Sequence, residues 1–271
     1  MRERTTCMLC AATLVGCVFG WRGEAEIVGD HDLAGIESVR IDLPSTPMSI
    51  DGCEPLATGA CPERLRYVVR VLATGGSEAD ARAHATKPAL VYETDAGLAR
   101  LQADIPLAVR GLVDLELDAM ELPADRDLEL HTGLGDIDVH GVRGAITVIV
   151  DRGDVAIDGG DAGVAVRLGA GDIDVRTAGE VDLDTRSGNV IVVQDGGARR
   201  VFVDAEGDVE VELASSDDLE LDLVAGGGGS ISVQTTSVVA LADHELARTV
   251  GAGTIRVEIR AQGEIVLTER D

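Results

Sequence analysis

Five acidic or amide side chains recur at a regular interval and are the first candidates for metal chemistry. Each follows a glycine and precedes Ile or Val: Asp136, Asp154, Asp172, Asn189 and Asp208. If the segments that carry them stack, neighbouring carboxylates in the resulting column repel one another, and a divalent cation such as Ca²⁺ would relieve that repulsion. Asp136, Asp154, Asp172 and Asp208 are therefore weak candidates for calcium ligands.

The spacing inside each unit argues against a dedicated calcium site. The nonapeptide calcium repeat places its Asp two positions after a glycine, where this chain has Ile137 or Val155. Glycine, Asp and Asn are also ordinary turn residues, because glycine adopts conformations closed to other residues and a carboxylate accepts hydrogen bonds from backbone N–H groups. We therefore expect a structural role for these residues, with no metal site and no cofactor.

The sequence contains few other patterns that could perform catalysis. It has neither His-Glu-x-x-His nor Gly-x-Ser-x-Gly, and His131 and His140, nine residues apart, are expected on opposite sheets. Acidic pairs are too numerous for a glycosidase pair to be singled out. After the first 32 residues the aromatic side chains are Tyr67, Tyr92 and Phe202, which are few platforms for sugar rings. We expect no enzymatic activity and assign no catalytic residue.

The five cysteines form an N-terminal group and a pair in the body of the chain. Cys53 and Cys61 flank a loop rich in Gly and Pro, and they are predicted to form a local disulfide in an oxidising compartment. The alternative is two free thiols in a cytosolic protein, and the N-terminal sequence argues against it.

Residues 1–17 have a basic start and a short apolar run, which is typical of a secretory signal peptide. The run is too short for a membrane-spanning helix. Leu14-Val15-Gly16-Cys17 resembles the bacterial lipobox, which implies lipidation of Cys17 and, with Val18 next to it, location at the outer membrane. Ordinary cleavage near Ala25 and a retained helix are the alternatives. Residues 18–32 are expected to be a tether.

The repeated turns must be positioned by short strands. Five-residue copies begin at Gly135, Gly153, Gly171, Gly188 and Gly207, at steps of 18, 18, 17 and 19 residues. Further alternating runs lie between them, so that strands recur about every nine residues. A fixed period of this size is typical of stacked coils. The prediction is an all-β fold, a single β-solenoid with about 18 residues and two strands per coil.

Alternation within each strand assigns one of its faces to the core. Aromatic residues make up only 2% of the chain, so the core must be aliphatic. Acidic residues occupy the outward positions between the apolar ones. The predicted internal ladders are Ile137, Val155, Ile173, Val190 and Val209, and Val139, Ile157, Val175, Val192 and Val211.

The solenoid is predicted over residues 33–267. Residues 121–267 hold the regular coils, and residues 33–120 form a less regular part that starts and caps them; a separate small β domain is the alternative. One short helix is expected at residues 77–84, with Ser77 as its N-cap. After Val211 the glycine steps widen to 22 and 24 residues, as expected of atypical terminal coils, and a last strand ends the chain.

The formal net charge of −26 restricts the partners of this protein. Nucleic acids and bare anionic membrane surfaces require concentrated positive charge, so neither is expected to bind. Contact with a membrane is expected through the lipid anchor only. The acidic residues are expected to form a solvated coat that also discourages aggregation between sheet edges.

The segment Thr132-Gly133-Leu134-Gly135-Asp136-Ile137-Asp138-Val139 resembles the bacterial putative-adhesin β-strand-repeat family, a domain of unknown function found in bacterial envelopes. The hallmark of that family is a recurring Thr-Gly-Ser-Gly-Asp-Ile-x-Val unit. Leu134 stands where the family has Ser, and later copies keep only the Gly-Asp-Ile/Val core. The resemblance covers roughly residues 33–267 and implies a β-solenoid at the cell envelope, but it transfers no binding site.

Taken together, the residues and the resemblance predict a non-enzymatic, lipid-anchored outer-membrane protein. It would present an acidic β-solenoid to another envelope or surface protein, whose identity the sequence does not reveal. A calcium-responsive envelope module and a polysaccharide-active β-helix enzyme are the two alternatives.

Overall fold

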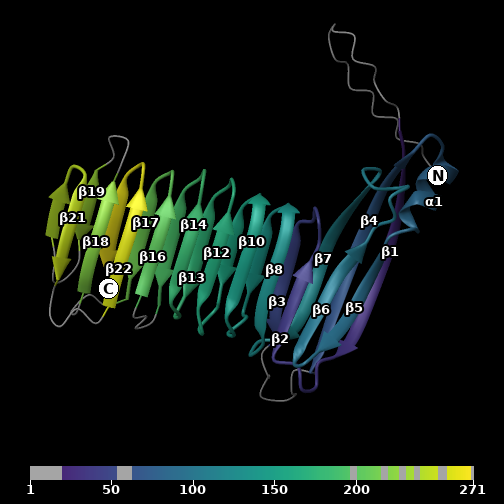
Figure 1. Cartoon of the computed structure of the whole chain (residues 1–271), viewed down its shortest axis with the longest axis horizontal. Helices are drawn as coiled ribbons and strands as arrows, with labels where there is room; N and C mark the ends of the chain where they lie inside the picture. Colours follow the sequence, from purple (N-terminus) through teal and green to yellow (C-terminus); the bar gives the residue numbers. More distant parts are fainter. Residues whose placement is uncertain are drawn as a thin grey trace, which may run out of the picture.

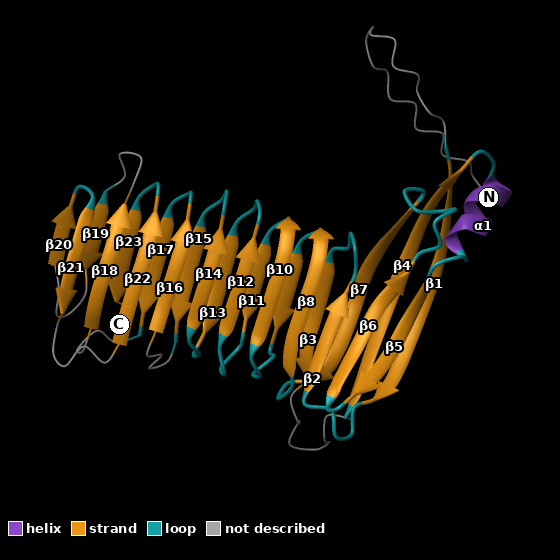
Figure 2. Cartoon of the chain, viewed as in Figure 1, coloured by secondary structure: helices purple, strands orange, loops and turns teal. Residues whose placement is uncertain are grey.

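The computed structural model of the protein describes residues 20–53, 63–195, 200–214, 219–225, 230–234, 239–249 and 255–269. Over these residues the chain is all-β apart from one short helix, and its strands form two sheets with mainly parallel pairing. The strands lie side by side in an elongated stack, with the N-terminal strands at one end and the C-terminal strands at the other (Figure 1, Figure 2).

The two sheets have twelve and eleven strands within the described residues. The first sheet contains, in spatial order, β1 (Trp21–Asp32), β4 (Arg64–Gly75), β7 (Val113–Pro123), β3 (Met48–Cys53), β9 (Ile137–His140), β11 (Val155–Asp158), β13 (Ile173–Thr177), β15 (Val190–Gln194), β17 (Val209–Leu213), β23 (Ile265–Glu269), β19 (Ile231–Gln234) and β20 (Val239–Ala242). The second sheet contains, from the same end, β5 (Ala89–Asp95), β6 (Leu98–Asp104), β2 (Ser38–Asp42), β8 (Asp127–Leu134), β10 (Ile146–Arg152), β12 (Val164–Leu168), β14 (Val181–Thr185), β16 (Arg200–Ala205), β22 (Ile255–Ala261), β18 (Leu219–Ala225) and β21 (Glu245–Thr249). The helix is α1 (Glu78–Ala85).

From β8 to β17 the chain alternates between the two sheets. Each strand pairs in parallel with the strand two elements later, so that Val155 lies beside both Ile137 and Ile173 in the first sheet. In the second sheet Ile146 lies beside both Leu128 and Val164. Residues nine positions apart in the sequence thus lie in opposite sheets. Residues about eighteen positions apart lie on neighbouring strands of the same sheet.

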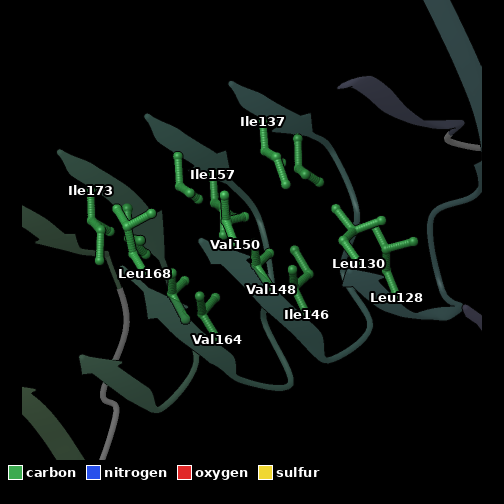
Figure 3. Close-up of a cluster of buried hydrophobic side chains, with 14 of the residues drawn as sticks. Leu128, Leu130, Ile137, Ile146, Val148, Val150, Ile157, Val164, Leu168 and Ile173 are labelled. Atoms are coloured by element: carbon green, nitrogen blue, oxygen red, sulfur yellow. The ribbon is translucent and has the colours of Figure 1, made fainter. Parts of the chain in front are cut away.

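The core is a set of aliphatic rows between the two sheets. All residues of the two predicted ladders are at most 3% exposed. The second sheet contributes matching rows, and Figure 3 shows Leu130, Val148 and Val164 pointing toward the side chains of the first sheet. Burial of one Val, Leu or Ile side chain contributes about 1.5–3 kcal/mol. The repeated rows therefore supply the main driving force for stacking.

Glycine is required at the turns that lead from the second sheet to the first. Gly153, Gly171 and Gly188 have φ angles of 136°, 140° and 144°, which other residues rarely adopt. A Cβ atom at Gly171 would overlap the carbonyl group of Gly153, and one at Gly188 would overlap that of Gly171. Successive turns therefore stack backbone on backbone, at a separation that only glycine permits.

The N-terminal end continues the same two sheets. β2 and β3 pair in parallel with β8 and β9, the first strands of the regular part. Beyond them, β7 pairs with β4 and β4 with β1 in antiparallel register. Residues 33–120 thus contribute strands to both sheets.

The prediction that residues 18–32 form a tether is wrong for Trp21–Asp32. This segment is β1, and it pairs with β4 along its whole length. Its inward positions include Gly23 and Gly29, which the sequence pattern does not mark as core residues. The structure explains both, because a Cβ atom at Gly29 would overlap the ring of Tyr67, and one at Gly23 would overlap the backbone of Ala81.

The predicted helix is confirmed as α1, at the end of the stack. The hydroxyl of Ser77 accepts a hydrogen bond from the backbone N–H of Asp80, as expected of an N-cap. Ala81 and Ala85 are buried. Ala81 on the helix faces Gly23 of β1 and Gly75 of β4, and these small residues let α1 approach both strands closely.

The C-terminal strands do not follow chain order. β22 and β23, the last two strands, lie between β16 or β17 on one side and β18 or β19 on the other. Strand β20 pairs antiparallel with β19 in the first sheet, and β21 pairs antiparallel with β18 in the second, at this end of the stack. In each sheet the last strand of the chain therefore lies between two strands that precede it in the sequence.

The turn geometry predicts different effects for two Gly→Ala substitutions. Gly171→Ala creates both backbone strain and a collision with the carbonyl of Gly153, whereas Gly111, with a φ of 85°, has open space within 4 Å of the position that a Cβ atom would take. We expect Gly111→Ala to lower the free energy of unfolding by about 1 kcal/mol and Gly171→Ala by more than about 2 kcal/mol in urea denaturation. Equal losses would contradict close stacking of the turns.

Candidate functional site

The acidic column expected from the sequence lies along the edge where strands of the second sheet turn into strands of the first. In each turn the side-chain Oδ1 atom accepts a hydrogen bond from the backbone N–H of the equivalent residue in the next turn. The bonds run from Asp154 to Asp136 (2.9 Å), from Asp172 to Asp154 (2.9 Å), from Asn189 to Asp172 (2.7 Å), from Asp208 to Asn189 (3.0 Å) and from Glu264 to Asp208 (2.7 Å).

This chain of bonds, which we call the Asp ladder, has a structural role. Turn residues were expected to bind local backbone groups, but the acceptors reach the next turn because the glycines bring the turns so close. Asn189 occupies one position with a neutral amide, so the bond requires an oxygen acceptor rather than a charge. Within the described residues no group of three or more His, Cys, Asp or Glu side chains is arranged to hold a metal ion.

Cys53, at the end of β3, is disulfide-bonded. Its predicted partner Cys61 lies outside the described residues, as does the predicted lipidation site Cys17. The Cys53–Cys61 pairing and the lipid anchor therefore stay predictions.

His131 and His140 lie on different sheets, as the nine-residue spacing predicts. His131 belongs to β8 of the second sheet, and His140 ends β9 of the first. His140 is half-exposed, with its Nε2 atom 2.8 Å from Oδ1 of Asp138. The two rings therefore cannot act on one ligand.

A charged cluster on the outer face of the second sheet was not found from the sequence. Arg40 binds Asp42 (Nε to Oδ2, 2.9 Å) and Glu129 (Nη1 to Oε1, 3.2 Å), and His131 lies 2.8 Å from the same Glu129 oxygen. The hydrogen bond to Asp42 raises the pKa of Arg40. Parallel pairing of β2 with β8 sets Arg40 opposite Glu129 and Asp42 opposite His131. Only knowledge of that pairing would have revealed the cluster.

An open cavity of about 570 Å³ lies beside this cluster. Its polar lining includes Asp42, His131, Gln102 and Arg110, and its apolar lining includes Ile149. A volume of this size could hold a small polar molecule. However, Asp42 and His131 are already held in the charged cluster, by Arg40 and Glu129 respectively.

A second unexpected cluster joins the two sheets at the N-terminal end. The ring of His31 in β1 stacks on that of Tyr92 in β5, with centroids 3.9 Å apart and an interplanar angle of 12°. The Nε2 atom of His31 lies 3.2 Å from the hydroxyl of Tyr67 in β4. Burial lowers the pKa of His31 and raises the pKa of both tyrosines. The chain has no other tyrosine, so both of its tyrosines lie at this junction.

Comparisons with known proteins do not assign a family to this chain. No family model and no curated protein sequence matches it. A solved structure of a putative cell adhesion protein from Clostridium sporogenes is 13% identical, covers 92% of this chain and 100% of its own, and has a TM-score of 0.34. A putative adhesin from Bacteroides fragilis is 11% identical, with coverage of 91% and 97% and a TM-score of 0.39.

Both of these structural neighbours are described as adhesion proteins, as is the repeat family that the sequence resembles. Their identities and TM-scores are too low to carry an argument about what this protein binds, and the repeat motif itself is matched by no family model. What this protein binds therefore has to be inferred from its own residues.

Substitutions in the Asp ladder distinguish a hydrogen-bonding role from a charge-dependent one. Asp154→Ala removes the acceptor for the N–H of Asp172, and we expect the free energy of unfolding to fall by about 1–2 kcal/mol. Asp154→Asn should be nearly neutral, because Asn189 already fills an equivalent position. Denaturation in urea at neutral pH measures both. A loss for Asp154→Asn as large as that for Asp154→Ala would show that the charge itself is needed.

The aromatic junction predicts a loss of stability in acid. The folded chain holds the pKa of His31 below its ordinary value of 6.5, with Asp30 opposing and Arg64 reinforcing the effect of burial. The unfolded chain therefore takes up the proton first, so this stabilisation is complete above about pH 7 and is lost as the pH falls through the lowered value. We expect the melting temperature to fall further in the wild type than in His31→Gln.

The matched control is His244→Gln, an exposed position at the opposite end of the stack. It should keep the pH dependence of the wild type. If His31→Gln and the wild type lose the same number of degrees between about pH 7.5 and pH 5, the junction does not sense protons.

Proposed function

We propose that this chain is a non-enzymatic, lipid-anchored protein of the bacterial cell envelope. It presents a rigid acidic β-solenoid for interaction with, or adhesion to, another envelope or surface protein. The solenoid is inferred from the regular alternation of strands between two sheets, with about eighteen residues returning the chain to the same sheet. Its main support is the distribution of apolar and charged side chains between the inner and outer faces of those sheets.

The inner faces carry aliphatic residues, and the outer faces carry most of the charge. Arg167 contacts Asp182 at 3.1 Å on the second sheet, and Arg176 contacts Asp195 at 2.6 Å at the margin of the first. Exposed ion pairs of this kind contribute only about 0–1 kcal/mol, so stability does not require them. With 49 acidic and 23 basic residues, the surface has far more acid than its own bases can neutralise. Such a surface suits a partner with a basic face.

The described polar groups support a binding role better than catalysis. The Asp ladder uses its carboxylate oxygens to hold the turns together, and the charged cluster of the second sheet is bonded within itself. The cavity beside that cluster is open and lies on the surface of the sheet rather than in a closed cleft that excludes water. These features favour neither of the two alternatives, the calcium-responsive module and the polysaccharide-active enzyme.

The anchor in this proposal is Cys17, on the strength of Leu14-Val15-Gly16-Cys17. The first strand begins at Trp21, so only three residues separate the fold from the lipid. Among the described residues there is no helix of the length and apolar character needed to cross a membrane. A disulfide at Cys53 agrees with export to an oxidising compartment.

Metabolic labelling with a fatty-acid precursor tests the anchor. We expect the label in the wild type and in Cys10→Ala, and its loss in Cys17→Ala, because lipid attaches at the cysteine of the lipobox. Cys10→Ala is the matched control, since it removes a thiol from the same N-terminal segment. Equal labelling of all three proteins would remove Cys17 as the anchor.

The interaction is tested on the same cells by crosslinking and purification from solubilised envelopes. A partner that recognises the acidic face should be recovered with the wild type and lost from Asp182→Asn/Asp184→Asn, whose neutral side chains keep their shape. It should also dissociate as salt is raised, because exposed charges are screened. Recovery of the same partner with both proteins, at all salt concentrations, would place the contact elsewhere.

A further inference from the structure

One corner of the molecule exposes large apolar side chains next to the point where the fold begins. Trp21 is 53% exposed, Leu107 is 80% exposed and Leu112 is 39% exposed. Trp21 starts β1, and the two leucines lie in the connection between β6 and β7. We call these three residues, together with the β4–α1 turn, the N-terminal corner.

Backbone pairing brings these segments to the same edge of the stack. Trp21 pairs with Gly75 at the end of β4. The backbone N–H of Thr74 donates to the carbonyl of Leu112 at 2.8 Å, just before β7 begins, and His84 of α1 contacts the carbonyl of Thr74 at 2.7 Å. Figure 1 shows the start of β1 and α1 together at this corner.

The charge at the N-terminal corner differs from that of the whole chain. The three segments, residues 20–24, 72–89 and 104–114, carry four basic and five acidic side chains, against 23 and 49 overall. The basic ones are Arg22, Arg82, Lys87 and Arg110. The net charge makes a bare membrane surface an unexpected partner for the molecule as a whole, but at this corner acidic and basic side chains nearly balance.

We propose that the N-terminal corner rests in the interface of the bilayer to which the protein is anchored. This inference rests on the proposed lipidation of Cys17. Four peptide units join Cys17 to Trp21, so their Cα atoms lie within about 14 Å of each other, even with the chain fully extended. Exposed Trp and Leu beside Lys and Arg are the side chains that bilayer interfaces accommodate, with rings and alkyl chains inward and charges at the headgroups.

The Asp ladder limits the contact to the corner. β7, β3 and β9 pair in parallel, so the start of β9, which Asp136 precedes, lies on the same edge as the start of β7 beside Leu112. Further along that edge the ladder presents Asp154, Asp172 and Asp208. Anionic headgroups repel this row of carboxylates, so the edge as a whole does not lie flat on the membrane. The corner touches the bilayer and the far end of the stack points away from it.

Tryptophan fluorescence can test this orientation, because Trp21 is the only tryptophan. Trp21 itself lies close to the anchor, so its quenching by lipid alone does not separate the anchor from the corner contact, and a probe distant in sequence is added. We would combine Trp21→Phe with Leu107→Trp, and as a matched control with Leu241→Trp, which is 85% exposed in β20 at the opposite end. The lipidated proteins would be reconstituted in vesicles of phosphatidylethanolamine and phosphatidylglycerol with brominated acyl chains.

We expect the brominated lipid to reduce emission from the Leu107→Trp protein by roughly half and to leave the Leu241→Trp protein unchanged, since apolar side chains at the interface are buried about 5–10 Å into the headgroup and acyl boundary. Equal quenching of both would mean that the molecule lies flat. Quenching of neither, with both proteins floating with the vesicles, would overturn the corner contact and leave the anchor intact. Failure of the wild type purified from cell envelopes to float would overturn the proposed anchor, and the corner contact with it.

A second measurement does not depend on a new tryptophan. Leu107→Asp/Leu112→Asp should make Trp21 of the anchored protein about twofold more accessible to acrylamide, because two charges at the headgroup level lift the corner from the bilayer. Val239→Asp/Leu241→Asp, at the far end, should have no effect. Unchanged accessibility in the Leu107→Asp/Leu112→Asp protein would contradict the contact.

Discussion

Close contact between successive turns is the constraint on which the rest of this structure depends. A ladder of aliphatic residues forms only if the chain returns directly beside its previous course, because a shift of one residue would turn each inward side chain toward solvent. The turns prevent that shift. Glycine lets one backbone lie against the next, and the Asp or Asn that follows binds the N–H of its neighbour, so both backbone distance and register are set at the same edge.

The Asp ladder also shows how a column of like charges can be tolerated. At the usual strand separation of about 4.8 Å, two carboxylates in water repel by about 1 kcal/mol before salt screening. A hydrogen bond between a carboxylate and a backbone N–H contributes about 1.5–3 kcal/mol. The hydrogen bonds therefore outweigh the repulsion, and the neutral Asn189 lowers it further in the middle of the column.

The two ends of the stack are closed in different ways, as open sheet edges must be. At the N-terminal end α1 packs on β1 and β4, and His31 with its two tyrosines joins the sheets. At the C-terminal end the last strands turn antiparallel. There Arg248 lies opposite the buried Leu221, and a charge on the inward side of an edge strand discourages further pairing. These closures leave the long outer faces as the surfaces available to a partner, with the proposed membrane contact at one end.

The recurrence of one short sequence unit every 17–19 residues was enough to predict the regular part of the fold. The strands, the inward ladders, the helix with its Ser77 cap and the separation of His131 from His140 all follow from local periodicity and local turn chemistry. Such features depend on residues a few positions apart or on the interval at which the unit recurs, so the amino-acid order alone determines them. The same order shows the acidic excess and the lipobox-like segment at Cys17.

Tertiary structure alone decided the features that join distant parts of the chain. Strand β1 escaped prediction because its inward glycines are core positions only when Tyr67 and α1 cover them. The charged cluster at Arg40 and the junction at His31 arise from strand pairing across many residues, and β22 and β23 fill positions that their place in the sequence does not indicate. Period and propensity describe how a strand relates to its neighbours in the chain, whereas these features depend on which strands become neighbours in space.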